Sequence, residues 1–266
     1  PILTGPVPSN IAWFIDKFIA DGGTARGGLP PYQAQYQRVR YSDIRTSIPI
    51  GAWRGLGSAP NTFAIESMID ELAIDAGIDP LTFRLKNFQT KQSRLINVLQ
   101  RAAEMSGWHK TLPKNTGRGI ACSIYQGETY IAAVAEIQID GMAEELKVSK
   151  IWCVQDSGLV INPDQVENQI MGNIVWGCSM VFNEEITFES GAVEQRNFDT
   201  YEVLRHSETP EMFIELITSE APPTAVGESA FAPVAPAITN AIYDATGFRV
   251  RNLPLSNENI FAKLKQ

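Results

Sequence analysis

The chain has 266 residues, enough to bury one or two hydrophobic cores, and 44% of them are hydrophobic while 20% are charged. Its 22 Lys and Arg against 30 Asp and Glu give a formal net charge of −8. Such a surface repels phosphate backbones and anionic lipid, so a nucleic-acid partner is not expected. The sequence shows no apolar run near the ~20 residues that span a bilayer.

The start of the chain carries no visible signal peptide, so the compartment, cytoplasm or periplasm, stays open. Because the chain starts at Pro1 rather than at a methionine, we expect it to be a piece cut from a longer polypeptide.

Residues that commonly bind metals or act as nucleophiles are sparse. Cys122, Cys153 and Cys178 are far apart and form no CxxC pair, so neither zinc nor an iron–sulfur cluster has its usual ligand spacing. We expect three buried free thiols. His109 and His206 have no acidic or histidine partner at metal-ligand spacing. No metal site made by direct side-chain ligation is therefore expected.

The first half of the chain has mostly helical patterns. An apolar patch over 11–19 predicts a short helix, and the alternation over 33–45 predicts a strand. A helix is predicted over 61–76, with Asp70 and Glu71 pointing outward, Gly77 as C-cap, and a buried face formed by Ile65, Met68, Ile69, Leu72 and Ala76. Further helices are predicted from Asp79-Pro80 to Asn87 and over 93–105.

From Gly117 onward the pattern becomes strand-like. β-Branched runs over 131–139 and 146–156, separated by Asp140-Gly141, predict a hairpin. Helices are predicted from Asn162-Pro163 to Phe182 and over 233–246, and strands over 185–189, 212–219 and 249–253. Strands and helices mix without a regular βαβ order, which predicts an α+β fold. We expect this fold to divide into a mostly helical region over residues 1–115 and a region of mixed strands and helices over residues 116–266.

Two glycine-rich segments are candidates for a functional site. In the first, Gly51 to Gly57, glycines flank Arg54 just before a predicted helix, so the backbone could approach an anionic ligand closely. The alternative is a tight turn in which Arg54 caps a neighbouring carbonyl.

The second segment, 222–233, is apolar apart from its hydroxyls and carries one carboxylate, Glu228. Burial among such residues raises the pKa of a carboxyl group and suits it to proton transfer near neutral pH. The alternative is a solvated loop glutamate, or one that caps the following helix.

Other polar residues are weaker candidates. Glu66, Asp70 and Glu71 are interpreted as a solvated helix face or local salt bridges, and Asp156 as a turn residue. Trp53 is interpreted as core or as a pocket wall. From the residues alone, the prediction ends at an α+β domain with one loop glutamate of interest.

Several segments together resemble the molybdenum hydroxylase family of xanthine dehydrogenases and aldehyde oxidoreductases, in particular its isoquinoline 1-oxidoreductase branch. The resemblance covers about residues 30 to 256 and is carried by six segments in the family's order. These are Gly51–Gly57, Phe63–Ala73, Gly77–Asn87, Gly117–Ala121 with Val134–Ile137, Asp156–Gly158 with Val160–Asp164 and Gln169–Gly172, and Ala225–Glu228 with Ala235–Ile242 and Ala245–Gly247.

The resemblance implies a molybdenum-cofactor-binding domain of the aldehyde oxidase and xanthine dehydrogenase type, here its C-terminal part. It implies that Glu228 acts as the base toward a hydroxyl group on molybdenum. It also implies that Arg54, Gly55 and Gly227 lie against the cofactor, and that Leu56 and Trp53 line the substrate pocket. The implied reaction hydroxylates an aldehyde or an N-heterocycle with water as the oxygen source.

The implied cofactor is a molybdenum–pterin, in its cytosine dinucleotide form, with iron–sulfur clusters on a partner subunit. The sequence departs from the family pattern at Ala225, Ser229 and Leu56, of which Leu56 replaces a frequently aromatic residue. Two glycine-rich cofactor loops of the family are absent, so the remaining N-terminal half of the subunit is an expected partner. The isolated chain is expected to be inactive.

Two rival hypotheses stay open. One is a half-domain that serves assembly or interaction only. The other is a cofactor-independent hydrolase in which Glu228 works with Asp156 across a cleft.

Overall fold

The computed structural model describes residues 23–42, 44, 48, 50–89, 91–142 and 145–255. The helix predicted over 11–19 lies outside these residues. The main elements, in chain order, are α2 (Ser58–Asp75), α3 (Pro80–Asn87), α4 (Ser93–Ser106), β1 (Thr116–Tyr125), β2 (Thr129–Asp140), β3 (Glu145–Asp156), α5 (Pro163–Phe182), β4 (Phe188–Glu189), β5 (Ala192–Val193), β6 (Glu211–Ile217) and α6 (Val234–Thr246). Short 3-10 turns, η1 (His206–Glu208) and η2 (Ser229–Phe231), flank β6.

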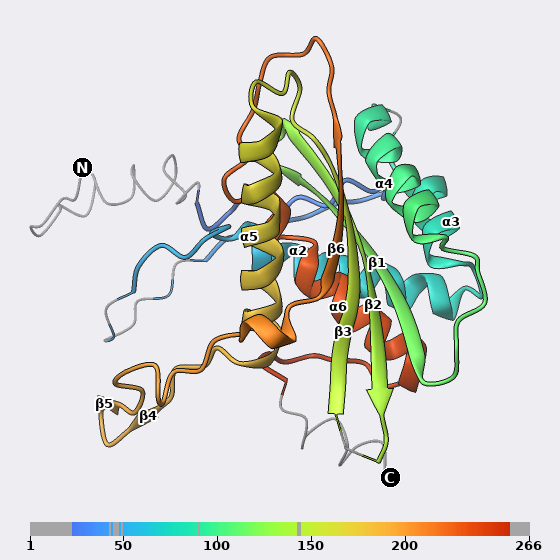
Figure 1. The fold of residues 1–266 in the computed structure, drawn as a ribbon. Helices are drawn as coiled ribbons and strands as arrows, with labels where there is room; N and C mark the ends of the chain where they lie inside the picture. Colours follow the sequence, from blue (N-terminus) through green and yellow to red (C-terminus); the bar gives the residue numbers. More distant parts are fainter. Residues whose placement is uncertain are drawn as a thin grey trace, which may run out of the picture.

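The four long strands form one mixed sheet in the order β1-β2-β3-β6 (Figure 1). β1, β2 and β3 run antiparallel to one another, whereas β6 is parallel to β3. The hairpin predicted around Asp140-Gly141 is confirmed, because β2 and β3 pair from Tyr130 opposite Asp156 to Asp140 opposite Glu145. The α+β prediction is confirmed as well.

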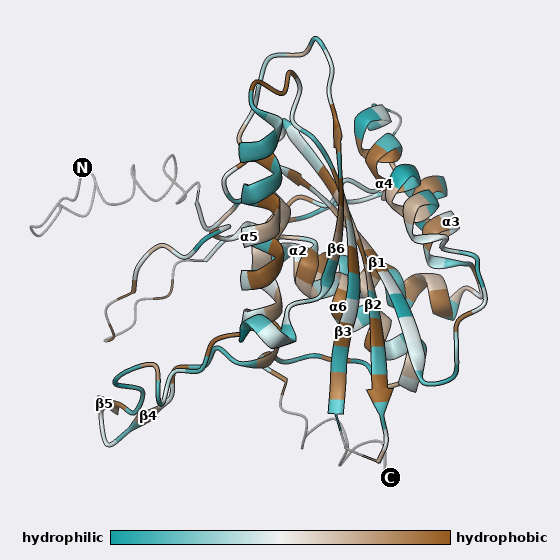
Figure 2. Cartoon of the chain, viewed as in Figure 1, coloured by the Kyte–Doolittle hydropathy of each residue, from teal (hydrophilic) through white to brown (hydrophobic). Residues whose placement is uncertain are grey.

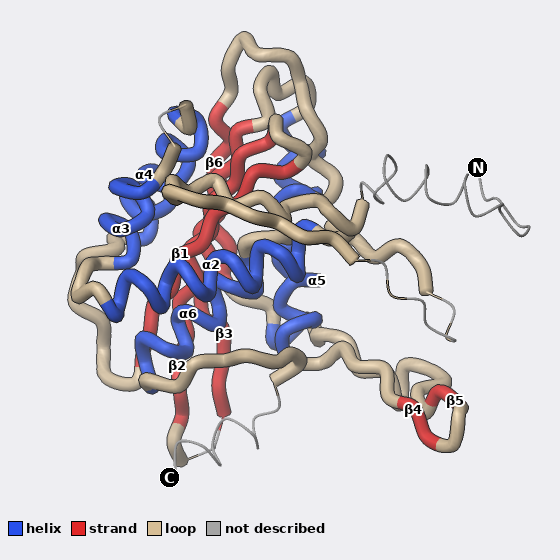
Figure 3. Tube along the Cα trace, turned by 180° about the vertical axis from the view of Figure 1, so that it is seen from behind, coloured by secondary structure: helices blue, strands red, loops and turns tan. Residues whose placement is uncertain are grey.

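Helices cover both faces of this sheet, which is seen from opposite sides in Figures 1 and 3. One face packs on α4 through a cluster that includes Leu95, Leu99 and Val134. The other face packs on α5 and α6 through a second cluster that includes Ile170 and Ile238. The helices from the first 115 residues thus share a core with strands from the later region, and the division at residue 115 stays a prediction.

β1 is a strand that the sequence pattern does not predict, because Gly117 and Gly119 interrupt it and it lacks the β-branched runs of β2 and β3. Ile120 and Cys122 belong to the cluster under α4, whereas Ala121 belongs to the cluster under α6. Strands buried on both sides are apolar throughout instead of alternating. Figure 2 accordingly shows apolar residues concentrated along the strands and on α6.

The predicted helices α2 to α6 are all present. The expected caps form: the Asn162 side chain accepts a hydrogen bond from Gln165 N at the start of α5, and Gly247 ends α6 in the left-handed region. None of the helices in the described part of the chain combines the length and apolarity needed to cross a bilayer.

The predicted orientation of α2 is correct for Ile65 and Ile69, which pack against a core cluster, and wrong for the rest of the predicted face. Met68 and Leu72, expected inside, are 49% and 45% exposed, whereas Glu66 and Asp70 are buried. The reason is Arg84, a fully buried cation on α3 whose Nε lies 2.9 Å from Glu66 Oε2 and whose Nη1 lies 3.6 Å from Asp70 Oδ1. A buried guanidinium requires paired carboxylates, and this requirement overrides the apolar periodicity.

Three strand predictions also need correction. The described residues of 33–45 form no strand and are exposed; the isolated bridge nearby, from Tyr32 to Phe88, lies before the segment. Segment 249–253 forms none either, because Arg249 and Arg251 pair with Asp70 and Glu71 on α2 instead of the sheet. Segment 185–189 contributes only β4, which pairs with β5 in an exposed arm (Figure 1).

The close approach of α6 to β1 depends on glycine. A Cβ at Gly119 would lie 2.2 Å from Ala237 O and 2.2 Å from Ala241 N, both backbone atoms of α6. We expect Gly119→Ala to push α6 off β1 and to lower the free energy of unfolding by about 1–3 kcal/mol, as overpacking does. Chemical denaturation of the protein measures this. Gly141→Ala is the matched control, since nothing lies within 4 Å of its added Cβ; equal losses for both variants would contradict the packing argument.

Candidate functional site

The segment that carries Glu228 connects β6 to α6 and is tied to the sheet at several points. Thr224 N donates to Ser157 O at 2.9 Å, and Thr129 Oγ1 donates to Ala225 O at 2.9 Å. On the other side of Glu228, Ser229 Oγ donates to Gln155 Oε1 at 2.8 Å. Glu228 is the residue before η2, where the chain turns into the buried start of α6. Its position is therefore fixed from both directions.

The carboxylate of Glu228 accepts hydrogen bonds from three groups that are remote in sequence. Gly55 N donates to Oε2 at 3.0 Å. Arg26 Nη1 lies 3.1 Å from Oε1, and the Tyr125 hydroxyl also donates to Oε1. With 29% of its side chain exposed, Glu228 is neither a freely solvated loop residue nor a side-chain cap of the following turn. The structure thus brings the two glycine-rich segments together.

Gly55 needs to be glycine for two reasons. Its φ of +88° lies in the left-handed region, which disfavours residues with a Cβ. An added Cβ would also lie 2.9 Å from Cδ1 of Phe231, in the turn that follows Glu228. The neighbouring Leu56 also has a positive φ, +49°, and is half-buried.

Arg54 binds the backbone of the second glycine-rich segment. Its Nε donates to Gly227 O at 2.9 Å, and its Nη2 donates to the Gln169 side chain at 2.8 Å. Its guanidinium also lies 5.7 Å from the ring centre of Trp176. In the structure, Arg54 therefore caps a carbonyl group, that of Gly227, as the second of the two alternatives for this residue predicts. Burial lowers the pKa of Arg54, although it stays a cation at any physiological pH.

The direction predicted for the pKa of Glu228 is wrong. Burial does raise this pKa, but the Tyr125 hydroxyl, the Gly55 N–H and the positive charge of Arg26 together outweigh burial. The pKa of Glu228 is lowered, so the group is ionised at neutral pH. Sequence composition indicates the apolar surroundings but not the donors. The pKa of Tyr125 rises to about 12, chiefly through burial and then through its bond to Glu228, so this hydroxyl stays protonated.

Trp53 lies beside this site on an exposed aromatic surface. The residue is 43% exposed, and its ring centre is 5.3 Å from that of Trp176. Both tryptophans line a largely apolar cavity of about 630 Å³ together with residues of α5 and of the arm, including Phe198 and Tyr201. Trp53 is thus a pocket wall and not a core residue.

Sequence reasoning missed Arg26, Tyr125 and Gln169. Arg26 lies in a glycine-rich stretch and is held against α2 through Asn61 Nδ2, which donates to Arg26 O at 2.8 Å. Tyr125 is the last residue of β1, just before a turn with positive φ at Gln126 and Gly127. Glycines and positive φ angles indicate turns in the chain, but they do not indicate a functional site. The three residues reach Glu228 and Arg54 only through the tertiary packing of the fold.

The remaining candidates are engaged elsewhere. Asp156 is the buried last residue of β3 and not a turn residue. Arg94 donates hydrogen bonds to both of its carboxylate oxygens, from Nε to Oδ2 at 2.8 Å and from Nη2 to Oδ1 at 2.5 Å. Burial raises the pKa of Asp156, but this ion pair lowers it overall. The carboxylate therefore has its own partner.

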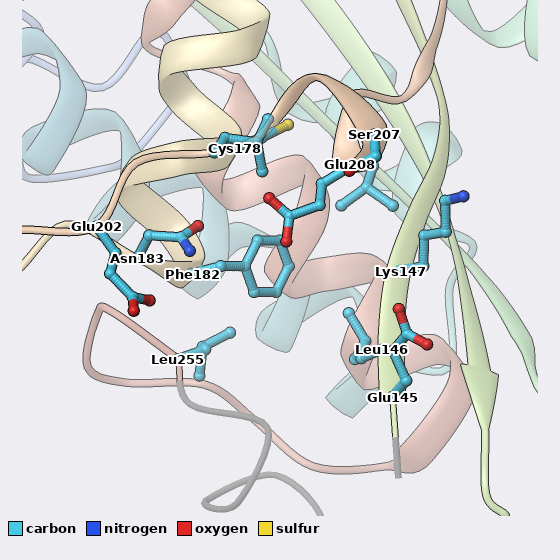
Figure 4. A pocket seen from close by; sticks show the side chains of 12 residues that line it. Glu145, Leu146, Lys147, Cys178, Phe182, Asn183, Glu202, Ser207, Glu208 and Leu255 are labelled. Atoms are coloured by element: carbon cyan, nitrogen blue, oxygen red, sulfur yellow. The ribbon is translucent and has the colours of Figure 1, made fainter. Parts of the chain in front are cut away.

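The cysteines are free and buried, as predicted, and burial raises the pKa of Cys153 and Cys178 to about 12. Cys178 borders a second cavity, of about 280 Å³, where Phe182 and Glu208 lie among the surrounding side chains (Figure 4). A thiol with this pKa is no nucleophile at neutral pH. Within the described ranges, no group of three or more His, Cys, Asp or Glu could hold a metal ion.

The Tyr125 contact can be tested by titration. We expect Tyr125→Phe to raise the pKa of Glu228, because the carboxylate loses a donor that favours its charged form. Infrared difference spectra between the protein and its Glu228→Gln variant, taken across pH, follow this carboxyl group alone. Tyr201→Phe is the control, since Tyr201 OH donates to a different carboxylate, Glu184, at 2.6 Å. An unchanged titration in Tyr125→Phe would refute the contact.

The Gly55 turn can be tested by a second pair of variants. Gly55→Ala combines a positive φ with a clash against Phe231, and left-handed backbone costs residues other than glycine about 1–2 kcal/mol. We expect a loss of stability of at least that size and a higher pKa of Glu228, since the Gly55 N–H moves away. Gly51→Ala, whose Cβ would meet nothing within 4 Å, should change neither quantity.

Comparison with known proteins places the chain in a family. The family model described as the molybdopterin cofactor-binding domain matches residues 55–210, and a second model of the same description matches residues 18–88. The chain is 35% identical over 256 residues to a nicotinate dehydrogenase chain of Pseudomonas putida, covering 90% of this chain and 21% of that protein. It is 32% identical over 238 residues to the beta chain of isoquinoline 1-oxidoreductase of Brevundimonas diminuta, covering 88% and 30%.

Solved structures agree on the fold. Quinoline 2-oxidoreductase from Pseudomonas putida 86 superposes with a TM-score of 0.72 over 82% of this chain and 53% of that one, at 13% identity. The chain spans about a fifth to a third of the length of the curated relatives described above. It belongs to the molybdopterin cofactor-binding domain family, found in the large subunits of molybdenum enzymes of the xanthine oxidase type.

Proposed function

We propose that this chain is the C-terminal part of the molybdenum-binding subunit of an oxidoreductase that hydroxylates an aldehyde or an N-heterocycle with water as the oxygen source. The observation that carries the proposal is the ionised Glu228 carboxylate. Its Oε2 accepts a hydrogen bond at 3.0 Å from the backbone N–H of Gly55, in the glycine-rich turn that contains Arg54. The family membership supports the cofactor class. The names of the two relatives described above, which refer to nicotinate and isoquinoline, support an N-heterocyclic substrate.

The residues at this site fit a molybdenum–pterin cofactor. A Cβ built at the exposed Gly227 finds nothing closer than Gln169 Oε1 at 4.0 Å, so a ligand can approach this backbone closely. The guanidinium of Arg54 offers donors beside it, and Asn173 Oδ1 is buried there without a partner in the described part of the chain. When bound, the cofactor supplies the two-electron redox chemistry that side chains cannot. Arg54, Gly55 and Gly227 would lie against it.

Glu228 then serves as the base, and the geometry selects one of its oxygens. An ionised carboxylate offers about four lone-pair positions. Oε1 accepts from both Arg26 and Tyr125, whereas Oε2 accepts only from Gly55 among the described residues. Oε2 therefore keeps a position free and is the oxygen that takes the proton. The donors on Oε1 fix the orientation of the carboxylate before the substrate arrives.

The remaining components of the enzyme are proposals of the same kind. The cofactor, in its cytosine dinucleotide form, would lie between this chain and the N-terminal half of the subunit, and electrons would leave through iron–sulfur clusters on a partner. Trp53 and Leu56 would contribute to the substrate pocket, with Trp53 already exposed beside Trp176. The chain alone would then be inactive.

The two rivals have less support. A hydrolase would need Asp156 as partner of Glu228, but Arg94 already binds both oxygens of Asp156. A module for assembly only would have no use for a partly exposed carboxylate with three aligned donors.

The decisive variant is Glu228→Gln in the assembled enzyme. The amide keeps the size of the side chain but cannot accept the proton, so we expect kcat to fall by a factor of roughly 10² to 10⁴, as for loss of a general base. Molybdenum and pterin content should stay at the level of the unmodified enzyme. Glu104→Gln, on the exposed face of α4, should leave kcat unchanged. Full turnover by Glu228→Gln with its cofactor bound would eliminate the proposed role.

A further inference from the structure

Arg26 contacts the candidate site and also lines a separate cavity. Through Nη1 it binds Glu228 and Tyr125. It also lines a separate cavity of about 390 Å³ between residues 25–31, the turn that joins β1 to β2, and the residues just before α4. A cavity of this size lies in the range that takes small organic ligands.

The lining of this cavity favours an anion. It contains the guanidinium of Arg26 and the amides of Gln89, Gln92 and Gln126, and no Asp or Glu. This composition is unexpected in a chain with a net charge of −8. The side chains of Gln89 and Gln92 make no hydrogen bond to the rest of the described chain. Gln92 also precedes the first turn of α4, which has no side-chain cap, so a partial positive charge faces the same region.

The rest of the lining is apolar and suits a flat ring. Leu29, Pro30, Pro31 and Ile124 contribute aliphatic surface, and Tyr130 contributes an aromatic face. Arg94 stacks on Tyr130, with its guanidinium carbon 4.6 Å from the ring centre, and fixes the orientation of this ring. The cavity thus combines an anion-binding end with walls for an aromatic group.

We propose that this cavity binds the carboxylate of a small aromatic acid, and that Arg26 is the residue that binds this carboxylate. The inference rests on the proposed function and narrows its substrate class to heteroaromatic compounds or aldehydes that carry a carboxylate. Arg26 then connects the charged end of the substrate to the base, because the same guanidinium lies 3.1 Å from Glu228 Oε1.

The guanidinium has enough donors for both tasks. Arginine offers five N–H groups in a planar fork. The contacts to Glu228 and Tyr125 both use Nη1, so the edge of the guanidinium formed by Nε and Nη2 contacts neither of them. The amide oxygen of Gln126 lies 2.9 Å from Arg26 Nη2 when its amide is oriented to satisfy both groups. A ligand carboxylate takes that acceptor position, and the Gln126 amide can turn its NH₂ group toward the ligand.

The same chemistry would suit a phosphate of the pterin cofactor, so the experiment has to separate the two anions. We choose benzoate and benzamide as probes, because they share size and shape and differ in charge. Binding to the assembled, cofactor-loaded enzyme is measured by calorimetry, and molybdenum content is measured by mass spectrometry.

We expect benzoate to bind at least roughly tenfold more tightly than benzamide, because its hydrogen bonds to Arg26 are charge-assisted. Arg26→Gln should remove this preference while molybdenum content stays unchanged, and Arg26→Lys should retain some of it. Arg101→Gln, a change at a 40% exposed arginine of α4 that pairs with Glu215, should keep the full preference.

Three outcomes would overturn the proposal. They are equal affinity for the two probes, no detectable binding of benzoate, and loss of molybdenum from Arg26→Gln, which would assign the cavity to a cofactor phosphate. Failure of the base hypothesis is distinguishable, since it would appear as turnover by Glu228→Gln with the Arg26-dependent preference for benzoate intact.

Discussion

Two complementary hydrogen bonds, between segments 173 residues apart, hold the site together. Arg54 donates from its side chain to the Gly227 carbonyl, and Gly55 donates from its backbone to the Glu228 carboxylate. A side chain of each segment therefore forms a hydrogen bond with the backbone of the other segment. The arrangement requires a residue without a Cβ at position 55, because the left-handed backbone there aims its N–H at the carboxylate. Without this connection Glu228 Oε2 would lose the one donor that it has among the described residues.

The sheet supplies the rigidity that this connection needs. The segment before Glu228 is fixed to the ends of β2 and β3 through Thr129 and Ser157, and the segment after it enters a helix that lies directly on β1. Tyr125 reaches the carboxylate from the end of β1. Catalytic groups placed by packed strands and helices keep their geometry without a bound ligand. The orientation of Glu228 is therefore a property of the folded chain.

Much of the fold could be predicted from the sequence, and the failures have physical causes. Helices with capping residues, such as α5 behind Asn162-Pro163, are predicted closely because the local signal is strong. The burial of Glu66 and Asp70 on α2 is not predicted, since the buried Arg84 that pairs with Glu66 lies 18 residues further along the chain. β1 is missed because Gly117 and Gly119 interrupt it and it lacks the β-branched runs that predict β2 and β3.

At the candidate site too, local sequence features are predicted correctly and contacts between distant segments are not. Glycine patterns point to Arg54 and Glu228, and the structure brings them together. The predicted pKa direction of Glu228 is wrong because its donors, Tyr125 and Arg26, come from distant segments whose sequences indicate only turns. The lowered pKa leaves the Glu228 carboxylate ionised, which is the protonation state that its proposed role as a base requires.

The most direct test is the structure of the complete subunit with its molybdenum–pterin cofactor. We predict that Glu228 Oε2 still accepts from Gly55 N and lies within hydrogen-bond reach, about 2.6–3.2 Å or one water away, of an oxygen bound to the metal. A Glu228 side chain turned toward bulk solvent, away from the turn at Arg54 while the cofactor is bound, would contradict it.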